Sequence, residues 1–238
     1  MAVRVLFTDR RGGVSAPPLE ELNLAAHVGD DPDAVRANRA LVASAVEVPP
    51  DRLVVLAAGS GGPVGVVDAD SPGEVSGVEA IVTRTPDLAI GVVAADCVPV
   101  LLADEDAGVI GAAHAGRQGV QARIVVDTVE RMAELGADPR RLRVWVGPAI
   151  CGRCYEVGED VAARTRAVAP AAESTTSWGT TALDLPRAVR AQLDECGVEH
   201  ANVFSDGRCT REDPTLYSYR RDGRTGRQAS VIVRSDDG

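Results

Sequence analysis

Apolar and polar positions follow two different periods along the chain, and together they predict a mixture of short strands and helices. Short continuous apolar runs rich in Val, Ile and Leu indicate buried strands. These strands are expected at residues 54–56, 65–67, 80–82, 88–94, 95–103, 109–114, 144–146 and 229–233. Apolar residues at helical spacing predict helices at residues 34–46, 124–135, 161–168 and 188–196.

Capping residues support three of the helix boundaries. Asp31 followed by Pro32 is typical of a helix start, with an aspartate cap and proline in the first turn. Gly136 and Gly197 stand where two of the helices should end. Strands and helices that alternate in this way predict an α/β or α+β domain. A chain of 238 residues favours one domain, spanning residues 1–238.

Cys97 and His114 are the strongest candidates for a chemical site. They lie near the outer ends of two neighbouring apolar strands that a polar, glycine-containing turn joins. A hairpin that pairs Ala103 with Gly108 puts the two side chains opposite each other, roughly 4.5–5.5 Å apart. A slip of one residue would move them to opposite faces of the sheet. The predicted pair suits a shared metal ion or a thiolate–imidazolium pair.

Composition and charge exclude several classes of partner. The chain has 25 basic and 35 acidic residues and a formal net charge of −10, which disfavours general binding to nucleic acid or to an anionic membrane. No apolar run approaches the ~20 residues that cross a bilayer. The first residues also lack a signal-peptide profile. We therefore expect a cytoplasmic protein whose five cysteines are reduced thiols.

Three further segments could carry chemistry or be ordinary turns. Two glycines flank Arg117 directly after His114, so the backbone there can approach an anion. Basic turns at residues 8–15 and 218–222 are candidate anion or sugar contacts, with a solvated turn as the alternative. The C-x-x-C at residues 151–154 has neither a second pair nor a following helix signature. We interpret it as a structural turn.

Six segments in order along the chain resemble the YfiH family, long labelled multicopper polyphenol oxidase or laccase-domain proteins. The matching segments are T-D-R-R-G-G-V-S at 8–15, L-N-L-A-A-H-V-G-D-D-P at 22–32, A-D-C-V-P-V-L-L at 95–102, H-A-G-R at 114–117, G-P-A-I-C-G-R-C-Y-E-V at 147–157 and S-Y-R-R-D-G-R-T-G-R at 218–227. Arg117 stands where many members have Trp, which resembles the actinobacterial branch.

The resemblance implies a single-domain α/β fold with a central mixed sheet flanked by helices. It also implies purine nucleoside phosphorolysis, acting on adenosine, inosine and methylthioadenosine, with adenosine deamination as a second reaction. Nucleoside and phosphate would then be the partners of a monomer or small homo-oligomer. The family's metal is zinc, or copper in some preparations, held by a His–Cys–His set beside the nucleoside pocket.

The resemblance assigns these roles to the residues of this chain that match the family's motifs. Cys97 and His114 would be catalytic and would supply two of the three metal ligands. Arg10, Asn23, Gly116 and Arg117 would contact the substrate. Ser60 stands where the family has its third ligand, a histidine, and a neutral hydroxyl is a poorer zinc ligand than imidazole.

The missing histidine leaves two alternatives to the nucleoside enzyme. One is a catalytically impaired member that keeps a role in binding a ligand or partner. The other is a metal-free cysteine hydrolase in which His114 activates Cys97. His27 is a further imidazole that could approach the site, although no spacing argument places it there. His200 lies between a predicted helix and a strand and is interpreted as structural.

Overall fold

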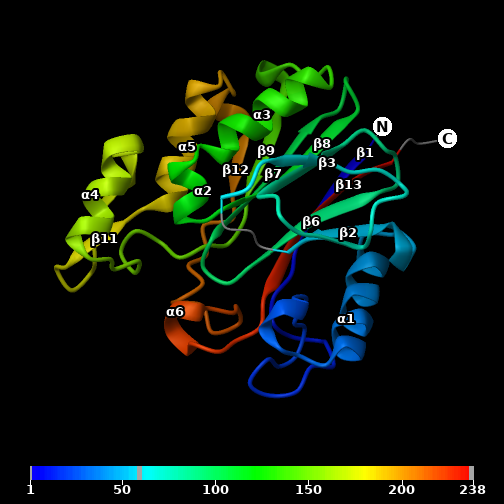
Figure 1. The fold of residues 1–238 in the computed structure, drawn as a ribbon, viewed down its shortest axis with the longest axis horizontal. Coiled ribbons are helices and arrows are strands. Elements are labelled where there is room, and N and C mark those ends of the chain that lie inside the picture. Colours follow the sequence, from blue (N-terminus) through cyan, green and yellow to red (C-terminus); the bar gives the residue numbers. More distant parts are fainter. Residues whose placement is uncertain (1, 58–60, 236–238) are drawn as a thin grey trace.

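The computed structural model describes residues 2–57 and 61–235, whose strands form two mixed sheets (Figure 1). The five-stranded sheet has the order β1 (Ala2–Phe7), β13 (Gln228–Ser235), β6 (Ala89–Ala94), β2 (Leu53–Leu56) and β4 (Glu74–Val75). The six-stranded sheet has the order β12 (Val203–Ser205), β9 (Arg143–Val146), β7 (Val98–Asp104), β8 (Val109–Ala115), β5 (Ala80–Thr83) and β3 (Val64–Val66). A separate hairpin joins β10 (Glu173–Thr175) to β11 (Thr181–Leu183).

Helices cover the two outer faces, while the sheets pack against each other. The helices are α1 (Pro32–Ala45), α2 (Arg117–Gln121), α3 (Ile124–Glu134), α4 (Glu159–Val168), α5 (Leu185–Glu195) and α6 (Tyr219–Asp222). Helix α1 packs on the five-stranded sheet, whereas α2, α3 and α5 lie on the far side of the six-stranded sheet (Figure 1). A third apolar cluster fills the space between the sheets.

The layering explains the continuous apolar runs. Every residue of β7 and of β8 is buried, because another sheet covers one face and helices cover the other. The predicted mixed α/β class is confirmed, with the strands divided between two mixed sheets. In the described part of the chain, no helix combines the length and apolarity needed to span a membrane.

The three helix boundaries predicted from capping residues are confirmed by the backbone, whereas α4 and α5 begin two and three residues earlier than predicted. Asp31 caps α1 by accepting a hydrogen bond from the N–H of Asp33 at 2.9 Å. Gly136 and Gly197 follow α3 and α5 with φ angles of 101° and 79°, a region that glycine enters without a Cβ clash. His200 lies in a short 3₁₀ turn between α5 and β12, as expected.

The predicted register of the hairpin is wrong by two residues. Asp104 pairs with Val109, so Pro99 rather than Cys97 lies opposite His114. The Asp104 carboxylate accepts hydrogen bonds from the N–H groups of the turn, including that of Ala107 at 3.1 Å, and this keeps Asp104 in the ladder. A shift of two residues preserves the side-chain alternation. Cys97 and His114 therefore still share a face, diagonally rather than directly opposed.

Asp104 gives a test of how this turn is held. Its buried carboxylate also accepts bonds from the N–H of Asp138 and from Arg141, both at 2.8 Å. We expect Asp104→Asn to lower the free energy of unfolding by about 1–3 kcal/mol at neutral pH. Urea unfolding of both proteins over a pH series measures the difference.

The pH dependence of that difference has a defined sign. Burial alone raises the pKa of Asp104, but the hydrogen bonds from Asp138 and Arg141 outweigh it and leave the pKa below its usual value. The stabilisation is then fully present above the unfolded-state pKa of 3.8 and is lost as the pH falls through the folded-state value. A difference that grew on acidification would contradict this assignment.

Candidate functional site

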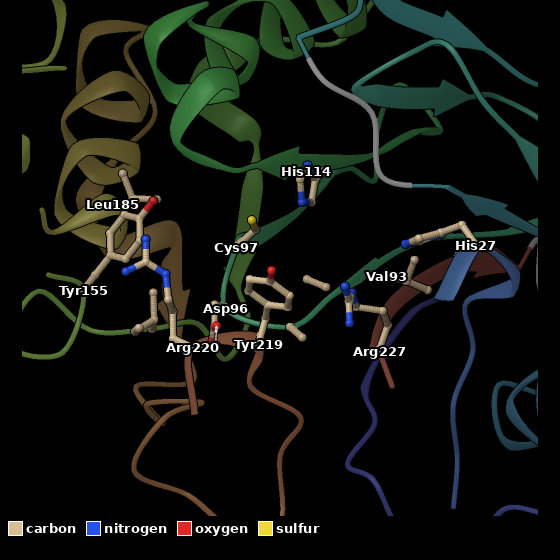
Figure 2. Close-up of a pocket in the computed structure, with 13 residues that line it drawn as sticks. His27, Val93, Asp96, Cys97, His114, Tyr155, Leu185, Tyr219, Arg220 and Arg227 are labelled. Atoms are coloured by element: carbon tan, nitrogen blue, oxygen red, sulfur yellow. Dashed lines mark hydrogen bonds between the residues drawn. The ribbon is translucent and has the colours of Figure 1, made fainter. Parts of the chain in front are cut away.

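Cys97 and His114 line a cavity of about 370 Å³ at one edge of the six-stranded sheet (Figure 2). Cys97 directly precedes β7, and His114 is near the end of β8. The other lining residues are His27, Val93, Ala94, Ala95, Asp96, Ile150, Tyr155, Leu185, Tyr219, Arg220 and Arg227. The cavity therefore combines an apolar wall with a thiol, two imidazoles and two guanidinium groups.

A buried carboxylate orients His114. The imidazole Nδ1 lies 2.7 Å from Oε1 of Glu79, and both side chains are buried. This contact leaves Nε2 as the ring nitrogen available to a thiolate or a metal. Gly116 packs against the pair, since a Cβ there would lie 3.1 Å from Cys97 Sγ and 3.2 Å from His114 Cε1. A side chain at this position would therefore require Cys97 or His114 to shift by a few tenths of an ångström.

The charges of the three groups are coupled. Burial alone would lower the pKa of His114, but the Cys97 side chain and the Glu79 carboxylate raise it to about 10. Burial would likewise raise the pKa of Glu79, but the hydrogen bonds from His114 and the Gly61 N–H lower it. In the metal-free protein the arrangement therefore favours an imidazolium between a sulfur and a carboxylate.

A second cavity of about 270 Å³ adjoins the first and shares Cys97, His114 and Tyr155 with it. Gly116 and Arg117, two of the predicted substrate contacts, line this second cavity. The Arg117 guanidinium also donates a hydrogen bond to Oε1 of Gln121 at 3.1 Å. The predicted catalytic pair thus lies where the two cavities meet.

Arg220 and Arg227 bring positive charge to the first cavity (Figure 2). Arg220 stacks over the ring of Tyr155 at 4.6 Å and donates to the backbone oxygen of Glu156. Arg227 donates only to backbone oxygens, and burial lowers its pKa from the usual value. Within residues 2–57 and 61–235, neither guanidinium forms an ion pair with a carboxylate. Both are therefore available to an anionic ligand.

The other two predicted substrate contacts lie behind the cavity walls. The Arg10 guanidinium lies 5.1 Å from the centre of the Tyr217 ring. It also donates a hydrogen bond to the backbone oxygen of Glu20 and forms an ion pair with the Glu20 carboxylate. Arg10 lines neither cavity. Asn23 is fully buried, and its Oδ1 accepts a hydrogen bond from the N–H of Arg227 at 2.9 Å. Asn23 therefore acts as a positioning residue for Arg227.

Asp96 joins three separate segments at the floor of the cavity. Its carboxylate accepts hydrogen bonds from Thr210 Oγ1 at 2.6 Å, from Ser218 Oγ at 2.7 Å and from the N–H of Arg220 at 2.7 Å. Its φ angle of 100° turns the chain sharply before Cys97. Because every contact converges on a buried group, Asp96 fixes where Cys97 and Arg220 lie relative to each other.

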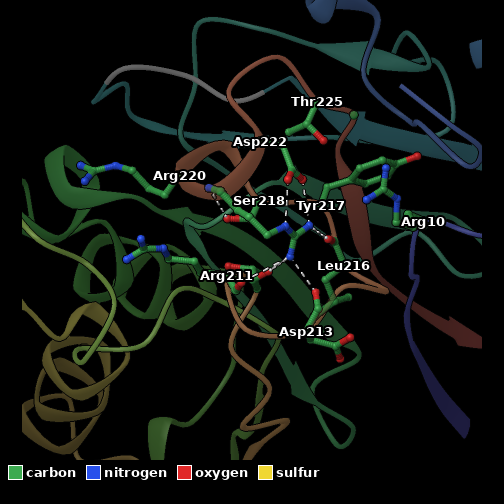
Figure 3. A network of polar contacts seen from close by, with 12 residues as sticks. Arg10, Arg211, Asp213, Leu216, Tyr217, Ser218, Arg220, Asp222 and Thr225 are labelled. Carbon is green, nitrogen blue, oxygen red and sulfur yellow. Dashed lines mark hydrogen bonds and ion pairs between the residues drawn. The ribbon is translucent and has the colours of Figure 1, made fainter. Parts of the chain in front are cut away.

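The basic turn at 218–222 serves two purposes. Arg220 faces the cavity, whereas Arg221 donates to the backbone oxygens of Asp213 at 2.9 Å and Leu216 at 2.6 Å. Its guanidinium also pairs with Asp222 at 2.8 Å. Figure 3 shows Asp213, Leu216 and Asp222 gathered around this network. Arg221 therefore supports the loop and is not a ligand contact.

The residues of this site suit two of the three metal positions that the family resemblance implies. A thiolate and an imidazole whose other nitrogen is fixed by a carboxylate form a donor set typical of zinc or copper. His27 lines the same cavity, and burial together with Arg227 lowers its pKa, which favours a neutral imidazole. Ser60, at the predicted third position, lies outside the described residues.

Several residues of this site are not indicated by the sequence patterns, and Glu79 and Arg227 are two of them. The sequence contains one indication for Glu79, because it is a single acidic residue directly before the apolar strand β5. A carboxylate buried at such a position needs a polar partner. Arg227 follows a run of basic residues in the sequence, and nothing local marks it as the one that enters the cavity. Both are identified only because distant strands and loops converge.

Comparisons with known proteins find similar sequences and similar folds. The model of a family described as multi-copper polyphenol oxidoreductase laccase matches residues 4–235. A Streptomyces coelicolor protein named purine nucleoside phosphorylase is 54% identical over 229 residues, covering 95% of this chain and 93% of the relative. A Mycobacterium tuberculosis protein of the same name is 46% identical over 230 residues, which cover 97% of this chain and 91% of the relative. The crystal structure of YfiH from Bacillus licheniformis superposes on this chain with a TM-score of 0.89 at 27% sequence identity. The match covers 98% of this chain and 92% of the YfiH chain.

Proposed function

The chain belongs to the multi-copper polyphenol oxidoreductase laccase family, and we propose that it is a purine nucleoside phosphorylase of the YfiH type. One observation carries the proposal: the Cys97–His114 pair and two arginines, whose guanidinium groups pair with no carboxylate among the described residues, face the same partly apolar cavity. The proposed substrates are adenosine, inosine and methylthioadenosine together with phosphate, and adenosine deamination is proposed as a second reaction. The cytoplasmic location expected from the sequence is part of the same proposal.

The cavity offers complementary surfaces for the two substrates. The guanidinium group of Arg227 would bind phosphate, because arginine forms paired hydrogen bonds to its oxygens. Arg220 lies on the other side of Tyr219, stacked on the ring of Tyr155 (Figure 2). The purine would lie on the apolar wall, where the Tyr155 ring and the side chains around Ile150 exclude water. This places the anion and the base at opposite sides of the ribose.

The chemistry requires charge stabilisation at the sugar and a proton for the base. A phosphate oxygen attacks C1′ as the glycosidic C–N bond breaks, and the bonding electrons leave with the purine, which takes up a proton. The ribose acquires oxocarbenium character, so phosphate held by Arg227 stabilises the transition state. In the metal-free protein, the raised pKa of His114 keeps a proton available at neutral pH.

A metal would add a second kind of chemistry to the same pair. Cys97 and His114 would hold zinc, or copper, with Glu79 fixing the imidazole tautomer. Bound zinc supplies a Lewis acid that lowers the pKa of water, which is what hydrolytic deamination of adenosine needs. Among the described residues, His27 lines the same cavity and is the one that would supply a third ligand.

The test is phosphate-dependent release of hypoxanthine from inosine by the purified protein, with and without added zinc. We expect release that requires phosphate and yields ribose 1-phosphate in equal amount. Release without phosphate would indicate a hydrolase instead. No turnover of inosine, adenosine or methylthioadenosine under any of these conditions would overturn the proposal and favour a binding role.

Arg227→Ala tests the phosphate contact. We expect the KM for phosphate to rise by about tenfold or more, with a smaller change in the KM for inosine, because a charge-assisted contact is worth about 1.5–3 kcal/mol. The matched control is Arg224→Ala, since Arg224 is exposed and lines neither cavity. An equal effect of both substitutions, or an effect of Arg227→Ala on inosine alone, would contradict the assignment.

The geometry also favours a second candidate function. Cys97, His114 and Glu79 stand in the order of a thiol nucleophile, a base and an orienting acid, as in cysteine hydrolases. Iodoacetamide at neutral pH would then alkylate Cys97 faster than the other thiols, and His114→Ala would abolish that selectivity. Uniform reactivity of the five cysteines would exclude this candidate.

A further inference from the structure

Three cysteines and a glutamate converge outside the catalytic pair. The Sγ atoms of Cys151, Cys154 and Cys209 and a carboxylate oxygen of Glu212 all lie within 4.8 Å of one another. The cysteines are free thiols, two of them buried, while Glu212 is exposed. Among the described residues, this is the one group of three or more potential ligands gathered so closely.

Two turns of the same design present these side chains. The backbone oxygen of Cys151 accepts hydrogen bonds from the N–H groups of Cys154 at 2.9 Å and of Tyr155 at 3.0 Å. In the same way, the backbone oxygen of Cys209 accepts hydrogen bonds from the N–H groups of Glu212 at 3.1 Å and of Asp213 at 2.9 Å. Each turn therefore places a first and a fourth residue toward a common centre. Two such turns facing each other form the usual frame of a four-ligand metal site.

The separations between ligand atoms suit a tetrahedral ion. Zinc–sulfur bonds of about 2.3 Å imply ligand atoms about 3.5–4 Å apart around the metal. Cys154 Sγ lies 3.3 Å from Glu212 Oε1, and Cys209 Sγ accepts the N–H of Cys151 at 3.3 Å. Only small side-chain adjustments are needed to admit an ion. We propose that Cys151, Cys154, Cys209 and Glu212 bind a structural zinc ion.

The chemistry of the four ligands selects the metal. Three thiolates and one carboxylate favour zinc over the hard cations, which prefer oxygen ligands. Four protein ligands leave no open position, so the ion would be structural rather than catalytic. Arg211 lies next to Glu212 and donates to the backbone oxygen of Cys154 at 3.2 Å, which places a positive charge beside this anionic group.

The cluster is connected to the wall of the cavity. Ile150 precedes the first turn, Tyr155 follows it, and both line the cavity. Thr210 follows Cys209 and donates to Asp96. A metal at this point would therefore join the two segments that hold the cavity floor and the tyrosine on which Arg220 stacks. Its predicted effect is to stabilise the wall without taking part in the reaction.

Metal analysis of matched variants tests the proposal independently of any activity. The double variant Cys97→Ala/His114→Ala removes the other metal-ligating pair, so zinc that it retains must lie elsewhere. We expect this double variant to keep one zinc per chain after dialysis and to lose it when Cys209→Ser is added. Adding Cys196→Ser instead, at a thiol outside the cluster, should leave the zinc in place.

A milder variant and a cobalt spectrum distinguish loss of the zinc site from misfolding of the protein. Glu212→Ala alters an exposed side chain, and on the Cys97→Ala/His114→Ala background we expect it to raise the Kd for zinc by more than about tenfold while the circular dichroism is unchanged. Cobalt in the double variant should give thiolate charge-transfer absorption that Cys209→Ser abolishes. No retained metal in the double variant, or a mass lower by two hydrogens from a disulfide among the three thiols, would overturn the proposal.

Discussion

Replacing Asp96 with alanine should destabilise the protein by about 3–5 kcal/mol, the cost of removing one partner from a buried charged network. The substitution leaves the hydroxyls of Thr210 and Ser218 and the N–H of Arg220 without their acceptor. It also places alanine at a φ angle of 100°, which is strained for a residue with a Cβ. The free energy of unfolding in urea, followed by circular dichroism, measures the loss.

Asp96→Asn is the matched control. It keeps an oxygen for the two hydroxyls, and asparagine tolerates a positive φ angle better than most residues. It presents an amide N–H₂ to the N–H of Arg220, however, so one of the three bonds is lost. We expect a loss of about 1–2 kcal/mol for this variant. Equal stability of the alanine and asparagine variants would show that the carboxylate is not the centre of the network.

Replacing Cys97 with alanine should lower kcat/KM for inosine phosphorolysis by about 10²–10⁴-fold, the range typical of losing a group that acts at the reacting atoms. His114→Ala should have a similar effect. Because the thiol and the imidazole act as one unit beside Glu79, the double variant should be little worse than either single variant. Initial rates at saturating phosphate give the three values.

The control for this cycle is Cys196→Ala, which removes a thiol at the end of α5. Circular dichroism and unfolding of each variant separate loss of activity from loss of structure. Additive effects of the two single substitutions would show that Cys97 and His114 act independently. Activity within about twofold of wild type in the Cys97 variant would remove the thiol from the reaction.

Much of the fold follows from local patterns. The apolar runs, the Asp31 cap and the glycines after α3 and α5 determine where the elements begin and end, because strand burial, capping and left-handed conformations are local properties. The hairpin was predicted with the correct face but the wrong register. The turn residues alone did not reveal that the Asp104 carboxylate would hold its own strand end in the ladder.

The C-x-x-C shows where a local pattern is insufficient. It is a turn, as predicted, and in three dimensions Cys209 and Glu212 lie close to its two cysteines. These two residues are far from the C-x-x-C in sequence, and one of them is not a cysteine. Spacing rules find metal ligands only when both pairs use the expected residue types.

By itself, the sequence determined most of the longer helices and strands, the fold class and the family, and it singled out Cys97 and His114. Only the tertiary structure placed Glu79 on the imidazole, Arg220 and Arg227 in the cavity, and Arg10 behind its wall. The physical reason is that helices and strands depend on neighbours along the chain. A site depends on side chains that meet only after distant strand ends and loops have packed together.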